Sequence, residues 1–144
     1  METPIDPKPE ARAAATWWAD KLTSDTRHDL GGRDAAEQAA TATFNVASVM
    51  LRQRFTPAQA DRFADALATL IDQHLRGEAP QQDFARLAIH CDYGIDPVLA
   101  EAATRAGLSV SMFDLPMKTN MWIIPGRVTV SEGYGAPDEV VWAA

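Results

Sequence analysis

The fold class is decided by Met121-Trp122-Ile123-Ile124-Pro125-Gly126-Arg127-Val128-Thr129-Val130. Two short runs rich in β-branched and aromatic side chains flank a Pro-Gly pair, and this pattern predicts strand, turn and strand. Proline and glycine suit the two central positions of a type II turn, where glycine supplies the positive φ. Type I′ and II′ turns match the strand twist better, so a bulge or a longer loop at this position is the alternative.

The residues on either side of this hairpin extend the sheet. Residues 87–93 alternate apolar and polar side chains, which is the period of a strand. Cys91 falls on the same face as Leu87 and Ile89, so we predict a small buried apolar residue rather than a reactive thiolate. Residues 139–142 are expected to add a short edge strand.

Four helices are predicted, three of them before the first strand. Apolar residues repeat at helical spacing over residues 10–23, 34–54 and about 56–76. The third of these helices has an N-cap threonine, a proline at its first position and a capping-box glutamine. Asp96 as N-cap and Pro97 at the first position start a fourth helix, which Gly107 ends. The second helix should bury one stripe, consisting of Ala36, Ala40, Thr43, Phe44, Ala47, Met50 and Leu51.

The sequence therefore predicts an α+β fold with a three-helix N-terminal layer, followed by a small, mainly antiparallel sheet with a fourth helix. Residues 1–9 contain three prolines and are expected to be a flexible leader. Residues 10–144 are expected to form a single α+β domain, because the chain has the usual length of one domain.

Composition limits the classes of function. Twenty acidic against thirteen basic residues give a net charge of −7, which disfavours general nucleic-acid binding. A single cysteine fits a reducing compartment, and neither a signal peptide nor a membrane span is apparent. We therefore predict a cytoplasmic protein that does not bind membranes.

Candidate metal sites and catalytic groups are few. The histidines His28, His74 and His90 lie far apart in the sequence. His90 and Asp92 are expected on one side of a strand, but a third ligand is not evident, so we expect no metal and no cofactor. A Gly-x-Ser-x-Gly elbow, a dinucleotide fingerprint and a P-loop are all absent from the sequence, so we name no catalytic residue and expect a protein that is not an enzyme.

The candidate binding residues are Tyr93, Lys118, Trp122 and Tyr134. They lie at predicted strand ends and turns, where loops present side chains on a rigid frame. Tyrosine and tryptophan are favoured at contact hot spots, so we predict that the four residues form one contact surface at an end of the sheet. The alternative is that Trp122 fills the core between sheet and helices.

Four segments together resemble a family of short uncharacterised proteins encoded by bacteria and their phages. The resemblance extends over nearly the whole chain and implies no known activity. The segments are Trp17-Trp18-Ala19-Asp20-Lys21-Leu22, Asp92-Tyr93-Gly94-Ile95-Asp96-Pro97-Val98-Leu99, Lys118-Thr119-Asn120-Met121-Trp122 and Gly133-Tyr134-Gly135-Ala136-Pro137.

These observations favour a non-catalytic, acidic binding protein, carried by a phage or mobile element and acting on a host protein, for example by inhibiting a defence system. The alternative is a small-molecule binder or small hydrolytic enzyme with a pocket between the C-terminal hairpin and the fourth helix. A third possibility is a self-associating structural protein, that is, a homo-oligomer. The expected partner in the leading hypothesis is another protein.

Overall fold

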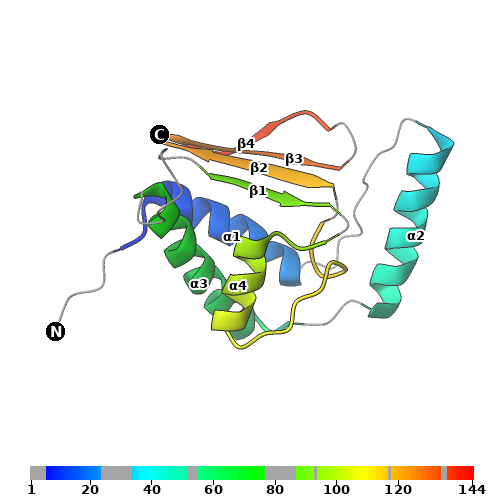
Figure 1. Ribbon diagram of the computed structural model, residues 1–144, viewed down its shortest axis with the longest axis horizontal. Coiled ribbons are helices and arrows are strands. Elements are labelled where there is room, and N and C mark those ends of the chain that lie inside the picture. The colour runs from blue at the N-terminus through cyan, green and yellow to red at the C-terminus, as the bar shows by residue number, and fades with distance from the viewer. Residues whose placement is uncertain are drawn as a thin grey trace.

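The computed structural model describes residues 6–23, 34–51, 55–76, 87–92, 94–116, 118–133 and 136–144, and within residues 35–51 the side chains at 35–40, 42, 43, 46 and 47. The elements in chain order are α1 (Pro9–Thr23), α2 (Ala35–Leu51), α3 (Pro57–Leu75), β1 (Leu87–Cys91), α4 (Pro97–Arg105), β2 (Thr119–Ile124), β3 (Arg127–Glu132) and β4 (Glu139–Ala143). Figure 1 shows α1, α3 and α4 on one side of the sheet. The predicted α+β class is confirmed: three helices come first in the chain, an antiparallel sheet follows, and a fourth helix lies between its first two strands in the sequence.

The sheet is an antiparallel meander in the order β1-β2-β3-β4. Ile124 pairs directly with Arg127, so the predicted turn contains only Pro125 and Gly126, and Gly126 has the expected positive φ of 81°. The alternative of a bulge or longer loop at this turn is wrong. The N–H of Gly126 donates to Glu10 Oε2 of α1 at 3.0 Å, which ties the turn to the helical layer.

Local side-chain caps start the helices as the sequence predicts. The Thr56 hydroxyl accepts the N–H of Gln59 at 3.2 Å, and the Gln59 side chain accepts the N–H of Thr56 at 2.8 Å. This reciprocal pair is the predicted capping box of α3. Asp96 Oδ1 accepts the N–H of Val98 at 2.9 Å and starts α4, while Gly107 follows that helix with a φ of 73°.

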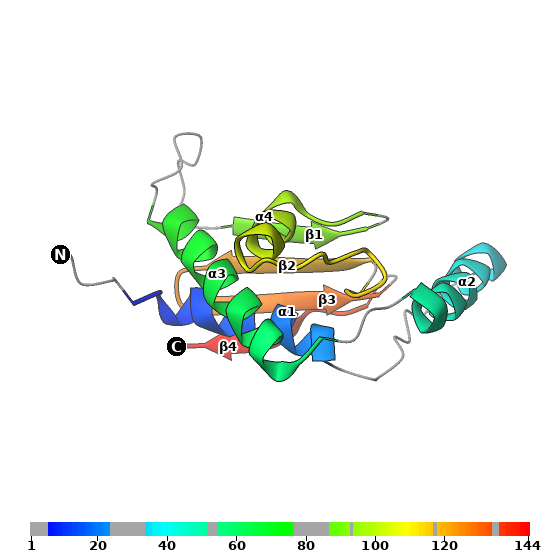
Figure 2. The same ribbon diagram turned by 90° about the horizontal axis from the view of Figure 1, so that it is seen from below.

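One hydrophobic core lies between the sheet and α1, α3 and α4. Figure 2, seen from below, shows these helices crossing the covered face of the sheet. The indole N–H of Trp18 points to the sulfur of Met121 at 3.2 Å, so the core includes a contact between α1 and β2, one of the two central strands. Fully burying a large apolar side chain stabilises the fold by about 1.5–3 kcal/mol. The largest fully buried side chains include Trp18, Phe63, Leu67, Ile71, Ile89, Leu99, Met121 and Ile123.

Helix α2 is placed differently from the other helices. It stands beyond the end of the sheet at which β1 ends, apart from the packed elements (Figures 1 and 2). Ala36 and Thr43, two members of the stripe predicted to be buried, are exposed, so their predicted burial is wrong. Ala40 and Ala47 are partly exposed, and the other side chains of the stripe lie outside the described residues. The apolar period reveals which face of a helix needs cover, but not which element covers it.

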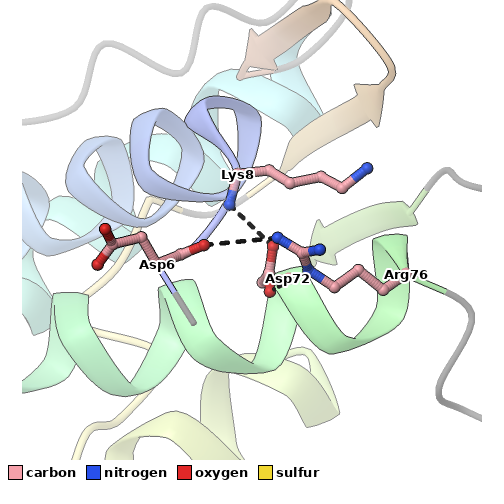
Figure 3. Close-up of polar contacts among 4 residues, drawn as sticks. All are labelled: Asp6, Lys8, Asp72 and Arg76. Carbon is pink, nitrogen blue, oxygen red and sulfur yellow. Dashed lines mark hydrogen bonds and ion pairs between the residues drawn. The ribbon is translucent and has the colours of Figure 1, made fainter. Parts of the chain in front are cut away.

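Residues 6–8, near the end of the predicted leader, are fastened to the last turn of α3 (Figure 3). Asp72 is only 7% exposed, and its Oδ1 accepts the backbone N–H of Lys8 at 2.8 Å while its Oδ2 accepts Arg76 Nε–H at 2.7 Å. The Arg76 guanidinium also donates to the carbonyl of Asp6 at 3.5 Å. These hydrogen bonds fix where the first residue of α1 lies relative to the last turn of α3. Pro9 is already the first residue of α1, and residues 1–5 of the leader lie outside the described residues.

Candidate functional site

The two faces of the sheet differ because successive side chains of a strand point to opposite sides. In β2, Thr119, Met121 and Ile123 are buried, whereas Asn120, Trp122 and Ile124 are exposed. Trp122 is 47% exposed on the face that α1, α3 and α4 leave uncovered. The alternative that Trp122 fills the core is therefore wrong, and this tryptophan is displayed on the surface.

The uncovered side of the sheet, here called the outer face, carries an apolar centre. Trp122 pairs with Thr129, which pairs with Val140 on the neighbouring strand, so these side chains form one row across the sheet. Four large hydrophobic side chains are exposed in the described residues. Three of them, Trp122, Ile124 and Val140, lie on this face. The outer face consists of Ala88, His90, Asn120, Trp122, Ile124, Arg127, Thr129, Ser131, Val140 and Ala143.

His90 orients the tryptophan. Its ring lies edge-to-face against Trp122, with the ring centroids 5.2 Å apart and an interplanar angle of 80°. His90 Nδ1 lies 2.6 Å from Asn120 Oδ1, and because an amide oxygen only accepts, Nδ1–H is the donor. The backbone N–H of His90 donates to Asp96 Oδ2 at 3.0 Å, so the N-cap of α4 also satisfies a donor on the edge strand β1.

The end of the sheet at which β1 ends holds a second polar cluster. Lys118 Nζ pairs with Asp92 Oδ1 at 2.6 Å, and the carbonyl of Lys118 accepts the N–H of Gly133 at 3.0 Å. Lys118 has a φ of 57°, a conformation in which the chain turns into β2. His90 and Asp92, weighed from the sequence as metal ligands, are thus engaged with Asn120 and Lys118. Among the residues described, no three potential ligand side chains gather as a metal site would need.

The four predicted binding residues occupy different parts of the sheet. Lys118 lies at the sheet end, and Trp122 lies four residues further along β2, which is about 13 Å in a strand. Trp122 is therefore at the middle of the outer face and not beside Lys118. Tyr93 and Tyr134 lie outside the described residues, although each directly follows a described residue of that sheet end, Asp92 and Gly133 respectively.

Sequence reasoning missed the contacts among Trp17, Lys21 and Glu132, which lie at the same end of the sheet as Lys118 but on the side covered by the helices. Lys21 Nζ lies 4.5 Å from the ring centroid of Trp17 and 3.1 Å from Glu132 Oε2, so α1 and β3 are joined by a cation–π contact and an ion pair. The spacing of Trp17 and Lys21, one helical turn apart, was the available signal. The pairing of His90 with Trp122 was also missed, because it depends on the register between β1 and β2.

Two features bear on the chemistry that was considered from the sequence. Cys91 is buried as predicted, and its burial raises the pKa of the thiol to about 11, so the thiol is protonated at neutral pH. The pocket expected between the hairpin and the fourth helix falls in a region where both elements contribute buried residues to the core. Leu99 of α4 and Met121 and Val128 of the hairpin are all buried in one hydrophobic cluster.

The comparison with known proteins corrects the resemblance drawn from the sequence. The chain matches the family model of the BTG family over residues 35–142, which extends from α2 to β4 and leaves α1 outside the match. BTG proteins are eukaryotic antiproliferative regulators that bind other proteins. No curated protein matches the chain. Within the part of the chain that is described, no helix is both long and apolar enough to cross a membrane.

The resemblance to short uncharacterised proteins of bacteria and phages is therefore wrong. The hypothesis of a phage- or mobile-element-borne protein that acts on a host protein is wrong for the same reason, as is the alternative of a small-molecule binder or hydrolytic enzyme. The quoted segments are short, and one of them contains the Asp96-Pro97 helix start, a feature that unrelated proteins share because helix capping favours the same residues there. A match over 35–142 includes α2, α3, α4, β1, β2, β3 and all of β4 except Ala143. The chain belongs to the BTG family.

Proposed function

We propose that this protein is an adaptor that binds a deadenylase of the CCR4-NOT complex. The family match over residues 35–142 carries this proposal, because BTG proteins bind the CCR4-NOT deadenylase, with CAF1 as an example. The partner is thus a protein, in keeping with a surface that displays apolar side chains on a strongly acidic molecule. BTG proteins are nuclear or cytoplasmic, and a cytoplasmic location of this chain stays a prediction.

The contact surface that we propose for this partner contains Trp122 and Lys118, together with Tyr93 and Tyr134, which directly follow Asp92 and Gly133 in the sequence. Support comes from the exposure of Trp122 on a rigid strand, where His90 restrains its ring. A tryptophan that is already restrained loses little conformational entropy when a partner covers it, which favours binding. Lys118 offers a cation at the sheet end, held in place by Asp92.

The test is direct binding between the purified protein and purified CAF1, measured by isothermal titration calorimetry. We expect a complex, and we expect Trp122→Ala, Lys118→Ala and Tyr134→Ala each to weaken it at least about tenfold, equivalent to about 1.4 kcal/mol. The matched control is Arg105→Ala, because Arg105 pairs with Glu101 on α4 as Lys118 pairs with Asp92, but on the helical side. This control should leave the affinity unchanged.

Two outcomes would overturn different parts of the proposal. If the unmodified protein does not bind CAF1, the proposed function is wrong. If it binds, but the three variants bind normally while Arg105→Ala weakens the complex, the function stands and the contact surface lies on the helical side. Circular dichroism of each variant establishes that the fold is retained, which we expect because Trp122 and Lys118 are outside the core.

A further inference from the structure

Two apolar surfaces in the described part of the molecule have no packing element against them. One is the outer face, with Trp122, Ile124 and Val140. The other is α2, which stands apart and carries Val46, 63% exposed, the fourth of the exposed large hydrophobic side chains. The uncovered face of an antiparallel sheet is normally polar, and an isolated helix of this length is only marginally stable in water. Covering either surface with another apolar surface would therefore be favourable, because apolar area would leave water.

We propose that α2 of one copy of this protein packs on the outer face of a second copy, reciprocally, in a closed dimer. Charge favours this pairing. Glu37 is the single charged residue within α2, whereas Arg127 is the single charged residue at the outward positions of the four strands. Two copies each supply one helix and one face, so a two-fold arrangement satisfies all four surfaces.

The dimensions of the two surfaces also agree. A helix of 17 residues, as in α2, is about 26 Å long. Strands of 5 or 6 residues, as in this sheet, extend over roughly 17–20 Å, and four strands span about 14 Å between the outermost chains. A helix about 10–12 Å in diameter that lies along the strands is therefore wide enough to cover the row of Trp122, Thr129 and Val140, which runs across three neighbouring strands and is about 10 Å wide.

The chain cannot bring its own α2 to this face. Only residues 52–54 separate Leu51, the end of α2, from Phe55, which packs against the core on the covered side of the sheet. Four extended residue steps span at most about 14 Å. Helices on opposite faces of one sheet lie roughly 20 Å apart, since each axis is about 10 Å from the sheet. The occupant of the outer face must therefore come from another molecule.

The dimer is tested by sedimentation equilibrium on the isolated protein of 144 residues. We expect a mass that rises with concentration to twice the 15.7 kDa of the chain. Val46→Glu on α2 and Trp122→Thr on the outer face should each raise the dimer dissociation constant at least about tenfold. Both substitutions keep the local propensity for helix and strand and affect exposed side chains, so the fold is expected to persist. Asp65→Ala, an exposed change on α3, is the matched control and should leave the constant unchanged.

Cross-linking identifies which surfaces meet. The single variants V46C and I124C are mixed and treated with a short bis-maleimide reagent, which the buried Cys91 should not reach. A predominant product between V46C and I124C supports the proposal. Predominant V46C homodimers or I124C homodimers would overturn it, as would a protein that stays monomeric at about 100 µM. No deadenylase is present in either experiment, so these results are independent of the proposed function. Because both proposals use Trp122, we expect dimer formation and deadenylase binding to exclude each other.

Discussion

The two faces of β2 carry similar side chains in opposite surroundings. Met121 and Ile123 point into the core and are fully buried, while Trp122 and Ile124, their direct neighbours in the chain, remain in contact with water. Apolar area on the inner face stabilises the fold, because it leaves water when the chain folds. Apolar area on the outer face contributes little to folding, so its presence points to binding. The difference separates the residues that maintain the structure from those available for a partner.

The two tryptophans offer the strongest test of this comparison. Trp18 is fully buried and touches Met121, so Trp18→Ala should reduce the free energy of unfolding by about 3–5 kcal/mol through a cavity in the core. Trp122→Ala should cost less than about 1 kcal/mol, because exposed substitutions are usually small. Urea denaturation of both variants measures the difference. Equal losses would mean that the outer face is part of the folding core.

Alkaline pH probes the inner face through Cys91. Its thiol has an ordinary pKa of 9.0, and burial raises the pKa to about 11 in the folded protein. Above pH 9 the unfolded chain releases this proton while the folded chain keeps it, so the unfolded state gains stability and the free energy of unfolding falls as pH rises. Between pH 8 and 10 the expected loss from this thiol is about 1 kcal/mol.

The control for Cys91 is Cys91→Ala, which lacks the titrating thiol. Other groups that titrate in this range are common to both proteins, so the comparison isolates the cysteine. We expect the variant to lose less stability than the original protein over the same pH interval. Parallel pH profiles would show that the thiol is solvated, and the burial of this position would then be wrong.

The turn between β2 and β3 fixes the register of these two strands, and the register decides which of their side chains lie opposite each other on each face. Gly126 has a φ of 81°, so Gly126→Val should lower the free energy of unfolding by more than about 1 kcal/mol, because β-branched residues resist this region. An added Cβ would meet only the Cβ of Ala144 at 3.9 Å, so the cost comes from the backbone and not from a clash. Gly94→Ala is the control, since a Cβ there meets nothing within 4 Å. Identical melting curves for Gly126→Val and the unmodified protein would remove the type II assignment.

The smallest expected effect concerns metal binding by His90 and Asp92. We expect EDTA to leave the melting temperature unchanged, because His90 and Asp92 already contact Asn120 and Lys118. A structural zinc ion contributes on the order of 10 kcal/mol, so its removal would be obvious in a melting curve. A large drop in melting temperature, or stoichiometric metal by mass spectrometry, would mean that this polar cluster binds an ion.

Local patterns by themselves determined most of the secondary structure. The alternation around Cys91, the capping box at Thr56, the Asp96-Pro97 helix start and the Pro125-Gly126 turn all lie where the sequence predicts them. Each depends on residues close together in the chain, whose preferences act over one turn or one strand. The burial of Cys91 followed from the same alternation.

Tertiary structure alone decided which apolar surfaces are covered. Alternation places Trp122 opposite Met121, but only the packing of α1, α3 and α4 makes one of those faces the core. The contact of His90 with Trp122 requires the register of two strands that lie about thirty residues apart in the chain. The exposure of α2 was likewise hidden, because its apolar period is the same whether the helix packs within its own domain or against another molecule. Periodicity is a property of one segment, whereas burial is a property of the segments that meet it.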